Sequence, residues 1–458
     1  MKIKKTTLCV TMLSVLSFSS SHAAVTATEA AKLGSSLTPW GAEKQGNADG
    51  SIPEYKGGMT KPPKNYVDGS NKFVDPFADE KPIVSITAAN IGQYKDKLTP
   101  GTMELLKRWP DYRVDVYPSH RSYPAMSAQR SAKTVANATD ANCRTESDGV
   151  GLAKECRGGI PFPIPKTGNE AMWNHLTREM GTNGAFFGNT STYIVDSAGN
   201  ASATKVLNLQ AEYPYWQDKS DSDFYTRAIS TTLSPAKDSG SITLIWYPMR
   251  YDTQDQRTWS YSTGQRRVRL APEFAYDTPI SALGGGIYYD ESNMFSGRMD
   301  RFDYKLIGKQ EIYIPYNTFK LATFPAAGVN GKQHVNPDAM RWELHRVWVV
   351  EATVKNGLRH TASKRRYYLD EDTWRIHLYD GYDQAGKIFR TLQANAIPNY
   401  IQGAGTIDFT SSLIAYDLAR GGYTFVSQMG ADNASYKPVN EIKESTFSAQ
   451  AIAGQGVR

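Results

Sequence analysis

The sequence contains few of the motifs that mark an enzyme. Its seven histidines are scattered, and neither an H-E-x-x-H metal motif nor a G-x-S-x-G nucleophile elbow occurs. Three consecutive glycines at 284–286 do not stand between a predicted strand and a predicted helix, as a phosphate-binding loop requires, and favour a tight bend or close backbone packing. We therefore predict no catalytic residue, no metal site and no cofactor.

A large excess of positive or negative charge is also missing. Lys and Arg total 52 against 46 Asp and Glu, which gives a net charge of +6. Two short basic clusters, 266–269 (RRVR) and 364–366 (KRR), are too isolated to form a nucleic-acid-binding face and favour solvated strand faces. We therefore expect no nucleic-acid partner.

Long apolar runs are missing except at the amino terminus. Lys2, Lys4 and Lys5 precede an apolar stretch over residues 6–18, and small residues follow up to Ala23 and Ala24. This pattern is typical of an export signal over residues 1–23 that is cleaved near Ala23. A membrane anchor is the alternative, but the stretch has about 13 residues where a spanning helix needs roughly 20. We expect a periplasmic protein, with peripheral attachment to the outer membrane left open.

Cysteine is rare, with three in the chain. Cys9 lies inside the apolar stretch rather than at its end, which disfavours lipid attachment. Cys143 and Cys156 flank a polar, glycine-containing segment, and an oxidising compartment favours a disulfide between them. Such a bond would stabilise the fold by about 3 kcal/mol. A zinc or redox pair is the alternative, but further cysteine ligands and a C-x-x-C spacing are missing.

The chain after the export signal begins with a segment poor in aliphatic residues. Residues 24–80 are rich in Gly, Pro, Lys and Asp, which predicts an extended strap over the surface of a single domain at 81–458, or partial disorder. Short helices are expected at about 87–98 and 102–108. A third is expected at 169–180, where Trp173, Leu176 and Met180 recur at helical spacing.

From about Thr204 onward, apolar and polar residues alternate with a period of two, which indicates β-strands. Turn signals occur at 262–265, 355–357, 370–372 and 384–386. Short turns require antiparallel neighbours, and a sheet of more than about 10 strands tends to curl. The sequence therefore predicts a β-rich α+β fold: a large curved antiparallel sheet, an incomplete barrel, with a few short helices at its concave side.

Aromatic residues of the strand region are the candidates for ligand contact. A curved sheet has one face that a few short helices cannot cover, so a cavity for a hydrophobic ligand is expected there. Each large ring can instead be ordinary core, and for any single residue this is the favoured interpretation. The candidate ligand-binding residues are Trp246, Trp259, Tyr261, Phe302, Tyr304, Trp342, Trp348 and Trp374.

Two groups of titratable residues are candidates for a functional site. Glu343 and His345 are two apart and share a strand face, where a structural pair is favoured over a catalytic dyad. The triplet Asp370, Glu371 and Asp372 lacks the glycine and the closing glutamate of a calcium loop, and it favours a solvated hairpin turn.

Several motifs occur together along nearly the whole chain after the export signal. They are 38–43 (TPWGAE), 46–53 (GNADGSIP), 158–165 (GGIPFPIP), 173–176 (WNHL), 264–269 (GQRRVR), 276–279 (YDTP), 313–317 (YIPYN) and 342–351 (WELHRVWVVE). Jointly they resemble the exported bacterial family catalogued as domain of unknown function 1329. The resemblance implies a half-barrel similar to lipoprotein-sorting factors, whose concave side accepts acyl chains. It also implies a setting beside exporters of the resistance-nodulation-division type and an outer-membrane β-barrel protein.

The leading hypothesis is a periplasmic carrier or chaperone for a lipid or another hydrophobic molecule in transport across the outer envelope, without enzymatic turnover. One alternative is a non-enzymatic structural adaptor for an envelope transporter. The other is an envelope hydrolase acting on lipid or glycan, which rests on Glu343, His345 and scattered acids alone.

Overall fold

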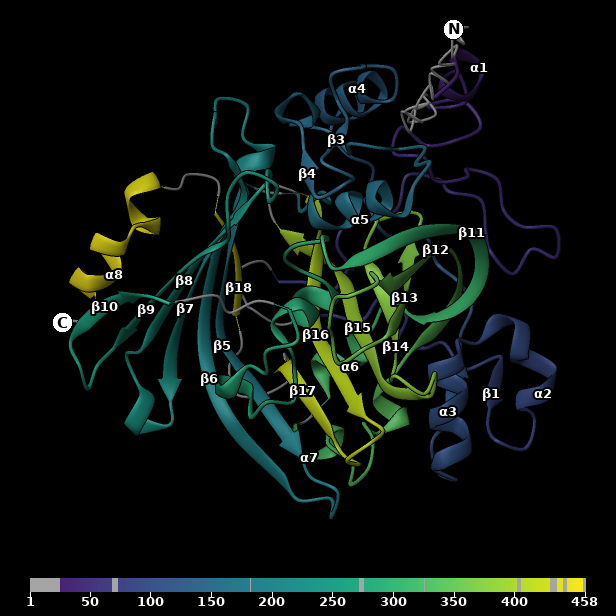
Figure 1. Ribbon diagram of the computed structural model, residues 1–458. Coiled ribbons are helices and arrows are strands. Elements are labelled where there is room, and N and C mark those ends of the chain that lie inside the picture. Colours follow the sequence, from purple (N-terminus) through teal and green to yellow (C-terminus); the bar gives the residue numbers. More distant parts are fainter. Residues whose placement is uncertain are drawn as a thin grey trace, which may run out of the picture.

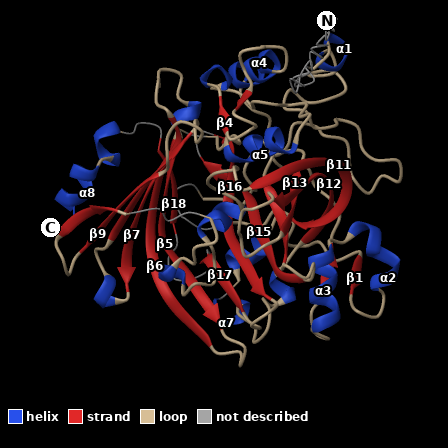
Figure 2. Ribbon diagram, viewed as in Figure 1, coloured by secondary structure: helices blue, strands red, loops and turns tan. Residues whose placement is uncertain are grey.

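One curved sheet dominates the computed structural model (Figures 1 and 2). The structure describes residues 25–67, 73–181, 183–271, 276–324, 326–401, 405–428, 435–439 and 443–455. The export signal predicted at 1–23 lies outside these residues.

Sixteen strands of the described residues belong to this sheet. Their order across it is β1 (Val84–Ile86), β2 (Val114–Val116), β12 (Trp342–Val354), β13 (Lys364–Asp370), β14 (Ile376–Tyr382), β15 (Ile388–Ile401), β16 (Gly405–Asp417), β17 (Tyr423–Gln428), β5 (Gly184–Val195), β6 (Ala201–Glu212), β7 (Phe224–Ser234), β8 (Ile242–Pro248), β9 (Arg257–Ser262) and β10 (Arg267–Leu270). Strand β11 (Phe302–Pro315) pairs with β12, and β18 (Ser435–Val439) pairs with β5. A separate hairpin consists of β3 (Thr145–Glu146) and β4 (Gly151–Leu152).

The sheet is a pair of antiparallel meanders that meet at one junction. Strands β5 to β10 follow one another in the chain, as do β11 to β17, and β17 pairs with β5 to join the two halves. The pairing is antiparallel except for a single parallel contact between Val116 and Trp342. Strands β1 and β10 stand at opposite ends of the order, so the described sheet does not close into a barrel. The predicted fold class is confirmed. The sheet begins earlier in the chain than predicted, with the short strands β1 and β2, and its first long strand is β5.

Alternating residues of the strands pack on opposite faces. Tyr367 and Tyr379 belong to the core on the concave face, whereas their neighbours Tyr368 and Leu378 belong to the core on the convex face. β-Bulges interrupt several pairings, for example between Asn395 and Ala396. Bulges increase the local twist of a strand and contribute to the curl of the sheet.

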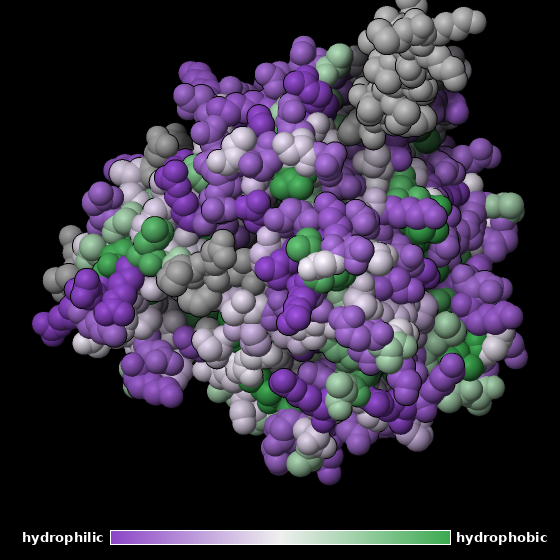
Figure 3. Space-filling model, viewed as in Figure 1, coloured by the Kyte–Doolittle hydropathy of each residue, from purple (hydrophilic) through white to green (hydrophobic). Residues whose placement is uncertain are grey.

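Short helices lie on both faces of the sheet. Helix α5 (Gly168–Leu176) contacts β11 and β12 on the concave side, whereas α3 (Pro100–Arg108) packs against β14 and β15, and α8 (Ala449–Gln455) against β8 to β10, on the convex side. The remaining helices are α1 (Ala27–Ala30), α2 (Ile91–Tyr94), α4 (Ala128–Asn137), α6 (Phe319–Thr323) and α7 (Ala326–Val329). Of the described residues, no helix is both long and apolar enough to cross a membrane. The face drawn in Figure 3 is mostly hydrophilic, with hydrophobic residues in small separate groups.

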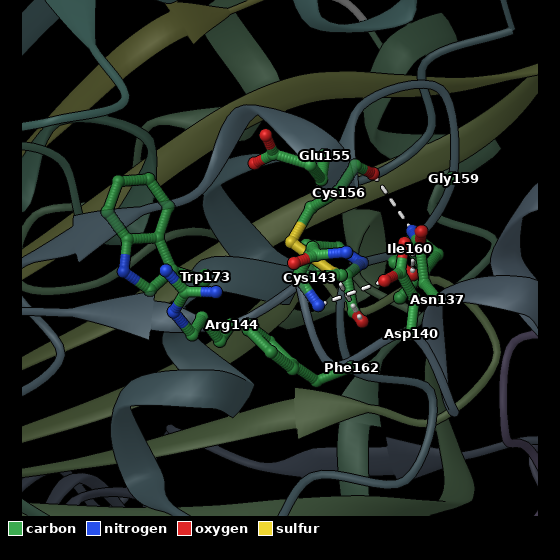
Figure 4. Close-up of a disulfide and its surroundings, with 12 residues drawn as sticks. Asn137, Asp140, Cys143, Arg144, Glu155, Cys156, Gly159, Ile160, Phe162 and Trp173 are labelled. Atoms are coloured by element: carbon green, nitrogen blue, oxygen red, sulfur yellow. Dashed lines mark hydrogen bonds between the residues drawn. A yellow bond between two sulfur atoms is a disulfide. The ribbon is translucent and has the colours of Figure 1, made fainter.

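Helix α4 was not predicted. Its apolar residues recur at helical spacing but are exposed or half-buried: Ala128, Ala132, Val135 and Ala136. Its buried residues are polar: Thr134 and Asn137. The Asn137 amide donates hydrogen bonds to the carbonyls of Cys156 and Ile160, at 2.9 and 3.1 Å (Figure 4). The helix is therefore held by polar contacts that a hydrophobic pattern does not show.

The predicted disulfide is present between Cys143 and Cys156 (Figure 4). The two Cα atoms are 4.6 Å apart, and the bond closes the loop that carries the β3–β4 hairpin. Trp173 of α5 lies close by and donates from its indole nitrogen to the carbonyl of Gly149 at 2.9 Å. The disulfide loop is thereby tied to the helix on the concave face.

The glycines at 284–286 serve both purposes that the sequence suggested. Gly284 and Gly285 have positive φ angles of 62° and 74°, which favour glycine. A Cβ atom on Gly286 would come within 1.8 Å of the Thr424 hydroxyl oxygen. The bend and the close packing are both confirmed.

Residues 25–67, a described part of the segment predicted at 24–80 and called the strap below, are irregular apart from α1 and lie over strands β11 and β12 and the β13–β14 turn. The carbonyl of Trp40 accepts a hydrogen bond from the indole nitrogen of Trp374 at 2.9 Å. Glu43 pairs with Lys309 of β11 at 3.1 Å. The strap therefore covers the turn between β13 and β14.

Helix α3 is docked through a buried carboxylate. The Gly101 backbone N–H donates to Asp380 of β14 at 3.1 Å, and the Thr391 and Tyr368 hydroxyls also lie within hydrogen-bond distance of this carboxylate. Burial raises the pKa of Asp380 to about 6, despite these hydrogen bonds that lower it.

We expect this carboxyl to make the folded state less stable as the pH rises from 4 to 6. In that window the unfolded chain releases the Asp380 proton, because its pKa is near 3.8, while the folded chain retains it. The loss integrates to roughly 3 kcal/mol and stops above pH 6. Asp380→Asn keeps the shape and removes this decline, which urea unfolding between pH 4 and 7 measures. Asp303→Asn, at an exposed position of β11, is the control. Parallel pH profiles for the wild type and Asp380→Asn would contradict the assignment.

Candidate functional site

A cavity of about 310 Å³ lies on the concave face, between the two halves of the sheet. This volume is at the lower end of the range of small-molecule pockets, about 300–1,000 Å³. One wall comes from β5 to β8 and the other from β15 to β17, while the end of α5 and the segment 283–296 complete the lining. The apolar and aromatic lining residues are Leu176, Met180, Phe187, Leu207, Leu209, Ala211, Tyr213, Tyr215, Trp216, Tyr225, Ala228, Ile245, Tyr247, Leu283, Ile287, Met294, Phe295, Ala394, Leu413 and Val426.

Strand β8 shows why the cavity is on this face. Its alternate residues Ile242 and Leu244 are buried on the convex side, in a small core that includes Ile452 of α8. Ile245 and Tyr247, which line the cavity on the concave side, are only half-buried. The chain therefore packs its own helix against one face of this strand and leaves apolar side chains of the other face partly uncovered.

Strand β7 repeats this asymmetry, and β6 adds uncovered apolar residues to the same concave face. Leu207 and Leu209 of β6 and Ala228 of β7 line the cavity and are half-buried, although apolar residues on a packed face are normally buried. Ile229, the neighbour of Ala228, is buried in the core beneath α8. The uncovered apolar surface is thus a property of the concave face over several strands.

Two aromatic side chains of the wall have their polar atoms hydrogen-bonded to backbone carbonyls. The Tyr215 hydroxyl donates to the carbonyls of Cys156 and Gly159, both at 2.7 Å. The Trp216 indole N–H donates to the carbonyl of Thr177 at 3.0 Å. These bonds satisfy the polar atoms and leave the ring faces for apolar contact.

The cavity wall carries little charge. Burial raises the pKa of Tyr247 to about 12 and raises that of Tyr225 as well, so both hydroxyls stay protonated at neutral pH. Among the described lining residues, the charged side chains are two arginines, Arg178 and Arg375. An apolar molecule with an anionic end suits such a wall better than one with a cationic end.

None of the eight aromatic candidates is among the described residues that line the cavity. Trp246, Trp259 and Tyr261 face the core beneath α8. Phe302 and Tyr304 are buried in the concave-face core, and Trp342 in the convex-face core. Trp348 and Trp374 stack with ring centroids 6.1 Å apart. Ligand contact by these eight residues stays a prediction.

The residues that do line the cavity were missed for a definite reason. Trp246 and Tyr247 are adjacent, so their side chains point to opposite faces of the sheet. The sequence pattern does not indicate which of these faces is concave. The large rings were selected by size, whereas the lining of β6 to β8 consists largely of Leu, Ile, Ala and Tyr. Half-burial of these residues is visible only in the folded chain.

The predicted solvated turn at Asp370, Glu371 and Asp372 is wrong, because all three residues are buried. The strap covers them, and the cations that accompany them come from distant segments. Arg121 pairs with Asp372 at 2.6 Å, and Lys309 pairs with Glu371 at 2.6 Å. Burial and the neighbouring Asp372 charge raise the pKa of Asp370 above its usual value.

Glu343 and His345 form the structural pair that was favoured. His345 Nε2 lies 3.2 Å from Glu343 Oε2, and both side chains are buried. The other Glu343 oxygen, Oε1, accepts hydrogen bonds from Arg341 at 2.6 Å and from Asn317 at 3.0 Å. Neither residue is among the described residues that line the cavity.

The prediction of solvated strand faces holds for one basic cluster and fails within the other. Arg266, Arg267 and Arg269 are exposed, as predicted. Arg365 is buried, so the prediction of a solvated strand face is wrong for this residue. It pairs with Asp290 at 2.7 Å, since the segment around Asp290 packs against β14 and β15, next to β13.

Comparisons with known proteins identify relatives along most of the chain. The family model described as "Protein of unknown function (DUF1329)" matches residues 85–453. An uncharacterized protein of Pseudomonas aeruginosa is 38% identical over 453 residues, which are 95% of this chain and 95% of that protein.

Solved structures with a similar arrangement are more distant. One, from Vibrio parahaemolyticus, is described as an outer membrane lipoprotein-sorting protein domain, with a TM-score of 0.41 and 14% identity over 62% of this chain and 97% of that one. Another is a DUF1329 family protein from Desulfovibrio piger, with a TM-score of 0.40 and 15% identity over 59% of this chain and 92% of that one. A LolA superfamily protein from Nitrosomonas europaea has a TM-score of 0.31 and 11% identity over 58% of this chain and 90% of that one. Scores at this level do not assign a ligand.

Proposed function

The chain belongs to the family described as Protein of unknown function (DUF1329), and we propose that it is a carrier that holds a lipid or a similar amphipathic molecule in the concave-face cavity. The observation that carries the proposal is the asymmetry of strands β7 and β8. Their convex face is packed by the chain itself, whereas apolar residues on the concave face of β6, β7 and β8 are half-buried around a cavity of about 310 Å³.

The driving force for binding would be the transfer of apolar surface out of water. Each buried methylene contributes about 0.8 kcal/mol, so an acyl chain gains affinity along its length without a specific polar contact. Leu207, Leu209 and Ile245 would contact the chain, and Arg178 and Arg375 would favour an anionic head group over a cationic one. Binding and release form no covalent bond, so the proposed mechanism includes no turnover.

The proposed setting is the periplasm, where a soluble carrier would exchange its cargo with envelope partners. An exporter of the resistance-nodulation-division type and an outer-membrane β-barrel protein are the proposed partners, as the family resemblance implies. Peripheral contact with the outer membrane during transfer belongs to the same proposal.

Titration with fluorescent acyl probes tests the proposal directly. Two probes with the same alkyl chain are compared, one with a carboxylate and one with a trimethylammonium head group. We expect saturable binding of one probe per chain, with the carboxylate probe bound more tightly. Failure of both probes to bind to protein freed of endogenous ligand would contradict a carrier function. Equal affinity of the two probes would contradict the role proposed for the two arginines but not the carrier function.

A further inference from the structure

Three side chains that are far apart in the sequence meet beneath the strap. His345 comes from β12, Asp370 ends β13, and Asp372 belongs to the turn that follows. Each offers one ligand atom, and these three atoms lie within 4.8 Å of one another. The residues are 1%, 0% and 8% exposed. Their spacing and their burial are those of a small closed site.

The imidazole of His345 is held in a fixed orientation. Its Nε2 lies 3.2 Å from Glu343 Oε2, and the Tyr316 ring stacks on it with centroids 3.8 Å apart. Nδ1 consequently faces Asp370 Oδ1, at 3.9 Å. Histidines that bind metals usually donate a hydrogen bond from the N–H of their other ring nitrogen to such a carboxylate, which fixes the tautomer and makes the ligand more basic.

One oxygen of Asp370 accepts no hydrogen bond from the described residues. Oδ2 accepts hydrogen bonds from the Thr373 backbone N–H at 3.0 Å and the Thr373 hydroxyl at 2.8 Å. Oδ1 is buried and has no hydrogen-bond donor among the described residues. A buried carboxylate oxygen without a donor costs free energy, which a cation between Oδ1 and Nδ1 would recover.

The carboxylates around the site differ in their counter-charges. Ion pairs join five of them to four cations of Lys and Arg: Glu43, Glu80, Glu343, Glu371 and Asp372 with Arg121, Lys309, Arg341 and Arg346. Among the described residues, Asp370 forms no ion pair with Lys or Arg, and its ion-pair partner is His345. A metal ion would supply the counter-charge at this carboxylate.

We propose that His345, Asp370 and Asp372 bind one divalent transition-metal ion. One imidazole nitrogen with two carboxylate oxygens is a ligand set that Zn²⁺ accepts, whereas Mg²⁺ and Ca²⁺ prefer oxygen ligands throughout. Arg121 does not block Asp372, because a carboxylate has about four lone-pair positions and the guanidinium uses two of them. The bound ion cross-links β12 to the β13–β14 turn. This site is separate from the proposed carrier function and uses none of the described residues that line the cavity.

Isothermal titration of the EDTA-treated, dialysed full chain with ZnCl₂ tests the proposal. We expect one ion per chain and a higher melting temperature in its presence. His345→Gln and Asp370→Asn are each expected to weaken binding by at least about tenfold. His334→Gln is the matched control, since His334 also pairs with an aspartate, Asp111, but lies outside the network. Absence of binding to the wild type, or equal binding by His345→Gln and the wild type, would overturn the proposal.

A crystal grown with ZnCl₂ provides a second readout that does not depend on variants. Anomalous diffraction at the zinc edge is expected to show a peak between His345, Asp370 and Asp372. Peaks at surface positions alone would overturn the proposal. Neither result bears on acyl-probe binding, so this inference and the carrier function can fail separately.

Discussion

Replacement of Ala228 by tryptophan is expected to reduce the affinity for an acyl probe at least tenfold. Ala228 lies on the concave face of β7, lines the cavity and is half-buried, so an indole there projects into the space that the ligand would occupy. Displacing only two methylenes of a bound acyl chain costs about 1.6 kcal/mol, which is more than a tenfold change in affinity. Fluorescence titration with the carboxylate probe measures the effect.

Leu233→Trp is the matched control for this variant. Leu233 lies on the same strand but is 37% exposed and is not among the described residues that line the cavity. The Leu233→Trp variant carries the same indole outside the cavity lining, and we expect it to bind the probe with the affinity of the wild type. Circular dichroism and urea unfolding establish that both variants are folded. Full probe affinity in folded Ala228→Trp would place the ligand elsewhere.

Replacement of Arg365 by methionine is expected to lower the free energy of unfolding by about 3–5 kcal/mol, because it leaves a buried carboxylate without its main counter-charge. Arg365 pairs with Asp290 at 2.7 Å, and both residues are buried. Burial by itself would raise the pKa of Asp290, but Arg365 and His360 lower it below its usual value. Urea unfolding at neutral pH measures the loss.

A double-mutant cycle separates the charge effect from the loss of packing. Asp290→Asn in the Arg365→Met background removes the unpaired charge and is expected to restore much of the stability. Arg269→Met, at an exposed position of β10, is the control for loss of one arginine and is expected to change stability by less than about 0.5 kcal/mol. Additive effects of the two buried substitutions would show that Arg365 and Asp290 do not stabilise each other.

The sequence carried enough information for the architecture but not for the junction that forms the cavity. Alternation after Thr204 and turns such as 384–386 predicted an antiparallel, curled sheet, because both signals are local. The pairing of β17 with β5 joins residues more than 200 positions apart, for example Tyr423 with Val195, and no local pattern predicts it. That pairing places the two walls of the cavity opposite each other.

The buried acidic turn shows the same limit at the level of side chains. Asp370, Glu371 and Asp372 have the composition of a solvated hairpin turn. They are buried because the strap covers the turn and because Arg121 and Lys309 supply the opposite charges. The composition of a segment indicates the local structure that it adopts by itself. The free-energy cost of burying its charges depends instead on the oppositely charged residues that the fold places beside it. The candidate metal site was missed for this reason.

Mass spectrometry of an organic extract of the protein, purified without detergent, tests the carrier function most directly. The account predicts that the wild type releases a lipid or a comparable amphipathic molecule in a defined ratio to the chain, and that Leu233→Trp retains this molecule while Ala228→Trp does not. Wild-type protein that is repeatedly free of such molecules and also fails to take up either acyl probe would contradict it.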